Sequence, residues 1–194
     1  YFSTNRRSPH ASFRDAVLNG QPDDKGLYFP SEIVSLTHDL LAALPDLPNE
    51  KIAFDVIRPY VGGEIPDDEL FEICRQTVDF DFPLVTLTDN ISALELFHGP
   101  TLAFKDVALQ LLGLLFEKFL ARRDDAITIV GATSGDTGSA AIDAVAGREK
   151  VDIFMLHPYG RVSDVQRRQM TTVLAPNVHN IAIQGTFDDA QAMV

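Results

Sequence analysis

The amino-acid sequence predicts an α/β protein in two parts: a mostly helical domain over residues 1–95, and a doubly wound, mainly parallel sheet layer over residues 96–194. Three observations support this prediction. Short amphipathic segments, separated by Pro and Gly, fill the first part. In the second part, apolar β-branched runs alternate with helical segments, as in strand–helix–strand units. A length of 194 residues also suits one large domain or two small ones.

Helices are expected in the first part wherever an apolar pattern follows a capping residue. Residues 8–20 start with Ser8 as the expected N-cap and stop at a glycine. Residues 49–63 form a second helix, which Pro59 and a pair of glycines should end. Residues 66–80 begin with a proline and three acidic residues, which the positive end of a helix dipole favours. The acidic residues of this region are read as a solvated face and not as a metal site.

The second part has the periodicity of a parallel sheet with its crossover helices. It begins with a long helix that has a wide apolar face, and β-branched runs then alternate with helices. The expected strands cover residues 126–132, 151–158 and 177–185, and the expected helices cover 101–122, 139–147, 163–174 and the residues from 187 onward. One further short strand, residues 83–88, is expected at the end of the first part. Because a parallel sheet needs cover on both faces, we expect this chain to be the N-terminal part of a longer protein.

Composition excludes several classes of function. The net charge of -12 argues against nucleic-acid binding and against an anionic membrane surface. The longest apolar run, residues 107–116, is too short to span a bilayer. A single cysteine, Cys74, excludes an internal disulfide framework and a multi-cysteine zinc site, and its amphipathic setting favours a buried structural thiol. We therefore expect a cytoplasmic protein without a bound metal.

A glycine-rich turn follows the expected strand 126–132. In GATSGDTGSAA, Gly131, Gly135 and Gly138 let the backbone turn tightly, and the helix that follows would point its first amides outward. Such a turn can bind a carboxylate or a phosphate. It lacks the Lys-Ser/Thr pair of a P-loop, and its glycines are spaced four and three apart, which is not the spacing of a dinucleotide loop. A plain strand-to-helix turn is the alternative.

Lys105 is the second candidate, at the start of an apolar helix in LFHGPTLAFKD. A cation is disfavoured at the positive end of a helix, and burial among apolar residues would lower the pKa of its amine and favour Schiff-base formation. Pairing with Asp106 would oppose that effect. A lysine that simply reaches solvent is the alternative.

Four motifs together resemble the threonine synthases, which belong to the fold-type II family of pyridoxal-phosphate enzymes. The order and spacing of all four match the family, and the resemblance covers essentially the whole chain. The FHGPTLAFKD form is specific to threonine synthases, whereas TSGxTG is shared more widely. The motifs are LFHGPTLAFKD (96–106), SGDTG (134–138), HPYGRVSDVQRRQM (157–170) and GLYFP (26–30).

The resemblance implies a reaction and the residues that perform it. Lys105 matches the lysine that holds pyridoxal 5'-phosphate as a Schiff base and then moves protons at Cα and Cβ of O-phosphohomoserine, giving threonine and phosphate. Asp136 matches the position that faces the 3'-oxygen of the cofactor. The loop that holds the substrate carboxylate is matched by Thr133, Ser134, Gly135 and Thr137.

The resemblance also implies what these residues lack. The glycine-rich loop for the cofactor phosphate is expected beyond residue 194, in a C-terminal remainder, so the chain by itself is expected to be inactive. His98 is either a contact to the substrate phosphate or a turn residue. The alternatives in function are another lyase or β-replacement enzyme of the same cofactor family and, more remotely, a nucleotide-binding α/β module.

Overall fold

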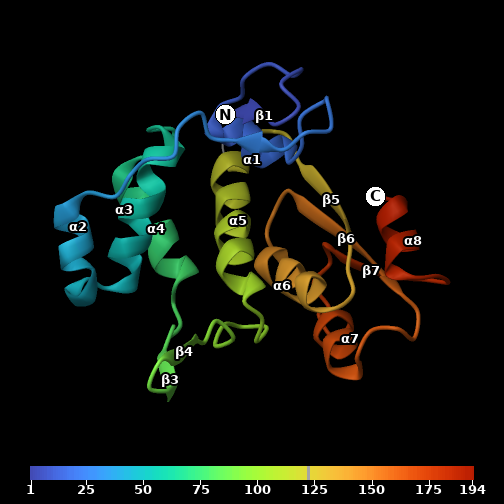
Figure 1. Ribbon diagram of the computed structural model, residues 1–194. Coiled ribbons are helices and arrows are strands. Elements are labelled where there is room, and N and C mark those ends of the chain that lie inside the picture. The colour runs from blue at the N-terminus through green and yellow to red at the C-terminus, as the bar shows by residue number, and fades with distance from the viewer. Residues whose placement is uncertain (122) are drawn as a thin grey trace. The chain divides into compact units, whose positions relative to one another are not determined.

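A computed structural model describes residues 1–121 and 123–194 of the chain (Figure 1). Backbone contacts divide it into two compact units, Tyr1–Val78 and Asp79–Val194. The units and the predicted domains differ in where they place residues 79–95, and the predicted domain boundary after residue 95 stays a prediction. No helix in the described part of the chain is long and apolar enough to cross a membrane.

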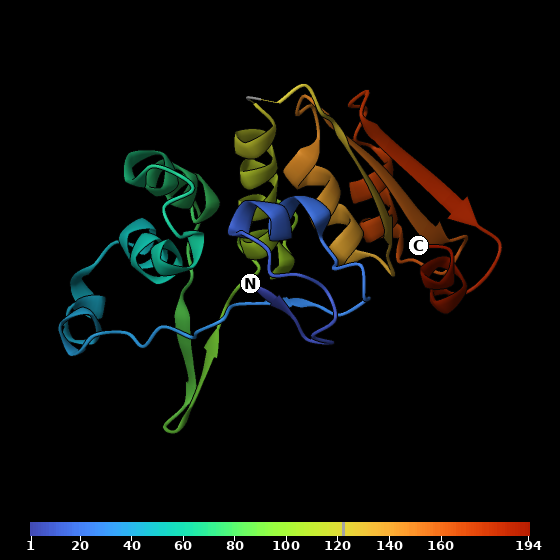
Figure 2. The ribbon, with the colours of Figure 1, turned by 90° about the horizontal axis from the view of Figure 1, so that it is seen from above.

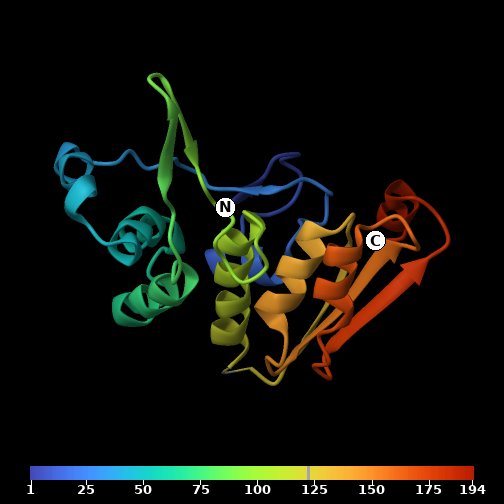
Figure 3. The same ribbon diagram turned by 90° about the horizontal axis from the view of Figure 1, so that it is seen from below.

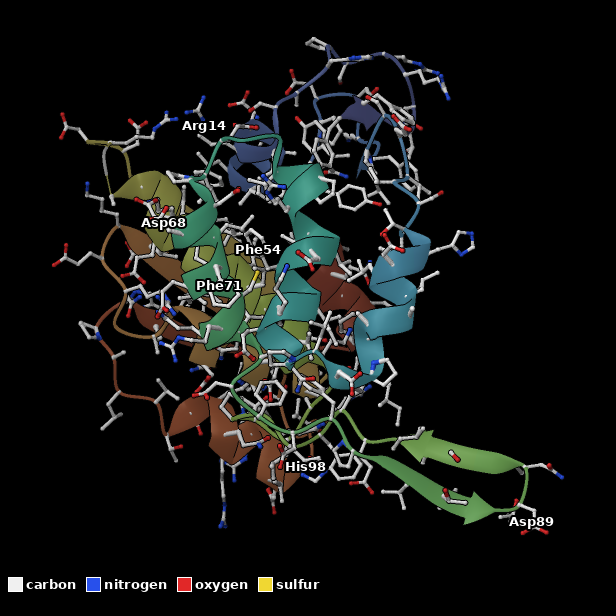
Figure 4. All side chains as sticks on the ribbon, turned by 90° about the vertical axis from the view of Figure 1, so that its left-hand side faces the viewer. Arg14, Phe54, Asp68, Phe71, Asp89 and His98 are labelled. Atoms are coloured by element: carbon white, nitrogen blue, oxygen red, sulfur yellow. The ribbon has the colours of Figure 1, made fainter. Side chains whose placement is uncertain are left out.

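The first unit is mostly helical, as predicted. Its core lies between α3 and α4, two helices that follow one another in the sequence. The rings of Phe54 and Phe71 meet edge to face there, with 5.7 Å between their centroids (Figure 4). Leu70 and Cys74 of α4 are fully buried, so the thiol is a core group, and burial raises its pKa to about 11. The elements are β1 (Phe2–Ser3), α1 (Phe13–Asn19), β2 (Tyr28–Phe29), α2 (His38–Ala43), the 3-10 helix η1 (Leu44–Asp46), α3 (Asn49–Val61) and α4 (Asp67–Thr77).

Two helix ends differ from the prediction. The N-cap of α1 is Ser12 and not Ser8, because both the backbone N–H and the hydroxyl of Ser8 are bonded to Asp24 in a separate loop. Pro59 lies inside α3 and does not end it. In the last turn a proline removes only one helical N–H, and Gly62, in the left-handed conformation, ends the helix.

The second unit contains the predicted parallel sheet. Its strands lie in the order β5-β6-β7, with Gly131 opposite Met155 and His157 opposite Ala182. Figures 1 and 2 show α6 and α7 on one face of this sheet and α8 on the other, which is the doubly wound arrangement. The elements are β3 (Leu84–Thr88), β4 (Ile91–Leu94), α5 (Lys105–Leu120), β5 (Ile127–Ala132), α6 (Asp136–Val145), β6 (Val151–Pro158), α7 (Asp164–Thr171), β7 (Val178–Ile183) and α8 (Phe187–Ala192).

A hairpin that the sequence did not predict precedes the sheet. The expected strand at 83–88 is β3, and it pairs antiparallel with β4 around a turn that contains Asp89 (Figure 4). All five residues of β3 are exposed, including Leu84 and Leu87. The hairpin therefore presents apolar side chains to solvent.

Helices α5 and α6 pack closely and run in the same direction. A Cβ atom on Gly113 would overlap the carbonyl oxygen of Ala144, so glycine is required for this approach. Nearer to the start of both helices, the Gln110 amide donates to Asp143 at 2.6 Å. Because contacts advance along both helices together, the two N-termini lie at one end of the unit, where α7 also begins (Figure 3). Both helices begin at different residues from those predicted: α5 at Lys105 and α6 at Asp136, within the glycine-rich motif.

Candidate functional site

The loop before α5 is held by a buried carboxylate. Asp106 is fully buried and accepts two hydrogen bonds from Thr101, one from its N–H at 2.9 Å and one from its hydroxyl at 2.5 Å. Gly99 lies against the same carboxylate, because a Cβ there would be 2.6 Å from an Asp106 oxygen. Asp106 therefore shapes the loop that carries the lysine.

Lys105 is the first residue of α5 and is half-buried. Its Nζ lies 5.0 Å from the centre of the Phe104 ring. Among the residues that the structure describes, no carboxylate forms an ion pair with this amine, and Asp106 is engaged by Thr101 instead. The amine is thus placed at the positive end of a helix without a neutralising acid beside it.

The glycine-rich turn joins β5 to α6, as predicted. The side chain of Thr133 is buried, and its hydroxyl accepts the N–H groups of Gly135 at 3.0 Å and Gly138 at 2.9 Å. Thr133 therefore closes the turn from inside and uses its hydroxyl oxygen within the protein.

The outward groups of the turn remain for a ligand. Ser134 is exposed, and Asp136 and Thr137 form the half-exposed first turn of α6. Within the described part of the chain, no acceptor is found for the backbone N–H groups of these three residues. Free amides at a helix N-terminus next to a serine and a threonine hydroxyl form an anion-binding surface.

Two of the glycines in the turn lie directly against α7. Gly135 has φ of 150°, and a Cβ there would lie within 2.9 Å of the Gln166 side-chain nitrogen. Gly138 has no room for a side chain either, since a Cβ would lie 2.7 Å from Sδ of Met170. The turn is therefore pressed against α7.

Helix α7 contacts both loops. Its N-cap is Ser163, as predicted, which accepts the N–H of Gln166 at 3.3 Å and donates to the Gln166 side-chain oxygen at 2.8 Å. Three residues further along, the Gln169 amide donates to the carbonyl of Thr101 at 2.9 Å. The loop of Lys105 is thus hydrogen-bonded to α7, and the glycine-rich turn packs against the same helix.

His98 has a local partner. Its Nε2 lies 2.7 Å from a carboxylate oxygen of Glu95, and its ring lies beside that of Phe97. Whether it also meets a substrate phosphate stays a prediction. Groups of three or more His, Cys, Asp or Glu residues that could hold a metal are absent from the described residues.

Comparison with known proteins finds similar proteins along the whole chain. Residues 1–78 match the family model described as the threonine synthase N terminus. The threonine synthase of Pseudomonas aeruginosa is 50% identical over 199 residues, which cover 100% of this chain and 42% of the relative. Along its whole length, the chain is therefore similar to threonine synthases.

Solved structures of family members have the same fold. A structure of threonine synthase from Brucella melitensis, described as bound to PLP, is 47% identical and has a TM-score of 0.90; the match covers 99% of this chain and 42% of that one. The yeast enzyme is 41% identical with a TM-score of 0.87, over 98% of this chain and 42% of that one. The chain thus spans about two fifths of the length of the family members it matches.

Sequence reasoning missed Asp106 and Gln169 as residues that build the site. For Asp106 the signal was its place directly after Lys105. If the helix begins at that lysine, the Asp106 carboxylate lies in the first turn and can accept hydrogen bonds from the preceding loop. For Gln169 the signal was the QRRQM end of the third motif, whose two glutamines lie three apart and hence on one helix face.

Proposed function

We propose that this chain is the N-terminal part of a threonine synthase, which converts O-phosphohomoserine and water into threonine and phosphate with pyridoxal 5'-phosphate as cofactor. The observation that carries this proposal is the attachment of two loops to α7: one presents the Lys105 amine, and the other presents the free amides after Thr133. An amine and an anion-binding turn at one end of the unit are what a cofactor aldehyde and an amino-acid carboxylate require.

The residues present fit the cofactor's reactive half. Lys105 meets the first requirement, an amine that no carboxylate among the described residues neutralises. When bound, the cofactor supplies an electron sink that stabilises negative charge on the substrate carbons. Lys105 would hold it covalently, and Asp136, in the first turn of α6, would face its 3'-oxygen.

The remaining work falls to groups of this chain. The amine of Lys105 removes and returns protons at Cα and Cβ of the substrate. The N–H groups of Ser134 and Thr137, with their hydroxyls, orient the substrate carboxylate, and Gly135 gives the turn between them its conformation. Thr133 contributes by holding the turn in shape, since its hydroxyl already accepts two N–H groups there.

We further propose that a C-terminal remainder completes the site and supplies the contacts to the cofactor phosphate. The side chains of Phe97, Leu102 and Phe104, which flank the lysine in sequence, are 50% to 69% exposed. Apolar groups beside a reactive amine would exclude water once covered. We also propose that the substrate is a small molecule. Residues 1–95 and 96–194 are proposed to be separate domains.

Phosphate release from O-phosphohomoserine by the full-length protein tests the proposed function. Replacing Lys105→Ala should lower turnover about a thousandfold or more, because both the covalent attachment and the proton transfers depend on that amine. Lys118→Ala, in the last turn of the same helix, is the matched control and should leave turnover within about twofold. Near-normal turnover after Lys105→Ala would contradict the proposal.

A further inference from the structure

Thr101 is fixed at three of its polar atoms. Its N–H and hydroxyl donate to Asp106, and its carbonyl oxygen accepts the side-chain N–H of Gln169, 68 residues later in the chain. The first two bonds are local and set the shape of the loop. Of the three bonds, only the third joins that loop to an element other than α5, so Gln169 decides where the loop lies relative to α7.

The same face of α7 holds the glycine-rich turn. Gln166 and Met170, which lie three before and one after Gln169, stand against Gly135 and Gly138. The hydroxyl of Ser139 in α6 lies within hydrogen-bond distance of two carbonyl oxygens, that of Gly135 at 3.2 Å and that of Gln166 in α7 at 3.5 Å. Both catalytic loops of the proposed site are thus positioned from one helix face.

We propose that α7 acts as a brace which sets the position of the Lys105 amine relative to the substrate-carboxylate turn, and that Gln169 is its positioning residue. This inference rests on the proposed function. Gln169 itself does not reach the reacting atoms. It acts through Thr101, which lies four residues before Lys105 in the loop that leads into α5.

Backbone geometry explains why the loop needs this bond. Leu102, the residue after Thr101, has φ of 60°, in the left-handed region that is unfavourable for a residue with a side chain. Its side chain is 69% exposed, so little packing holds it in this conformation. Loss of the Gln169 bond would allow the loop to relax and would move the start of α5, where Lys105 lies.

Kinetics of the full-length protein test the brace. Gln169→Met keeps the length and volume of the side chain but removes its N–H donor. We expect kcat to fall about tenfold, since a displacement of roughly 1 Å at a reacting group can cost up to a hundredfold, while KM stays within about twofold because the carboxylate turn keeps its own contacts. Gln169→Lys, which restores an N–H donor of similar reach, should recover most of kcat.

Hydrogen exchange provides a readout that does not depend on turnover. In the full-length protein without cofactor, Gln169→Met should speed exchange of the amides in residues 99–106 about tenfold and leave the rest of α5 unchanged. Gln76→Met is the matched control. The exposed Gln76 amide also donates a hydrogen bond, to Glu72 in the same helix α4 at 2.7 Å, and both residues are distant in sequence from the two loops.

The outcomes separate the two proposals. Unchanged kcat and unchanged exchange in Gln169→Met would overturn the brace, and so would faster exchange throughout the chain with kcat and KM affected alike, which is the mark of a merely structural residue. Failure of the wild-type protein to release phosphate would overturn the proposed function instead, and the exchange experiment would still decide the role of Gln169.

Discussion

A single carboxylate organises the N-terminal loop of the first unit. Asp24 accepts a hydrogen bond from the Ser3 hydroxyl and three more from the N–H groups of Gly26, Arg7 and Ser8. Since these bonds require the ionised form, the Ser3 bond first and then the amides lower the pKa of Asp24 from its ordinary 3.8 to about 2. A depressed pKa in the folded state stabilises the fold above the ordinary value, and this contribution is lost as the pH falls toward about 2.

We expect the Asp24 carboxylate to raise the melting temperature only at a pH above its ordinary pKa of 3.8. Asp24→Asn should lower the melting temperature of the first unit near pH 6, and the difference from wild type should shrink as the pH falls below 3.8. The exposed neighbour Asp23→Asn is the control and should show neither effect. A difference that stays constant between these pH values would show that the Asp24 charge is not what stabilises the loop.

At the residue scale, the sequence could predict residue type and spacing but not bonding partners. Lys105 and the turn from Thr133 to Thr137 were predicted as candidate site residues, because an amine and a run of small polar residues are recognisable in any context. The partner of Asp106 was not predictable. Its choice between Lys105 and Thr101 depends on where the helix begins, and that is a property of the folded loop.

The contact between α5 and α6 depends on the absence of a side chain at Gly113. Gly113→Ala should destabilise the second unit by about 1–3 kcal/mol, because the added methyl would overlap the carbonyl of Ala144 in a closely packed interface. Helix propensity acts in the opposite direction, since alanine favours a helix over glycine by about 1 kcal/mol. Denaturant unfolding of the full-length protein measures the net effect.

Ala108→Gly, at an exposed position of the same helix, isolates the propensity term and should cost about 1 kcal/mol. Unchanged or increased stability in Gly113→Ala would mean that the helices can separate slightly without cost, and would contradict the requirement for glycine there.

At the element scale, a strand was predictable where its own sequence carries the strand pattern, without help from the pairing partner. The runs that became β5, β6 and β7 are apolar and β-branched, and their bounds agree with the prediction to within one or two residues. Helix starts were harder to place. The pattern alone extended α5 back to residue 101, but the bonds of Thr101 to Asp106 hold residues 101–104 in turns and delay the helix to Lys105. The strand β4 was missed because ISAL is short and only its pairing with β3 makes it a strand.

At the scale of the whole molecule, the sequence before α5 carries apolar side chains that are exposed in the described part of the chain. The hairpin exposes Leu84, Leu87, Ile91 and Leu94 by 57% to 69%. A two-stranded hairpin is only marginally stable by itself, and exposed apolar patches mark surfaces that bind other protein segments. Together with a chain that spans about two fifths of its relatives' length, this supports the proposal that a C-terminal remainder covers the hairpin and the lysine loop.

The 194-residue chain by itself is therefore expected to bind pyridoxal 5'-phosphate weakly and to make no threonine. Lys105 can still react with the aldehyde, but the contacts to the cofactor phosphate are proposed to lie in the remainder. Loss of two charge-assisted hydrogen bonds, about 3 kcal/mol, would weaken binding about a hundredfold relative to the full-length protein. Absorbance titration of both chains with the cofactor measures this ratio. Equal affinities, or threonine formation by a preparation whose mass shows only this chain, would place the phosphate contacts within residues 1–194.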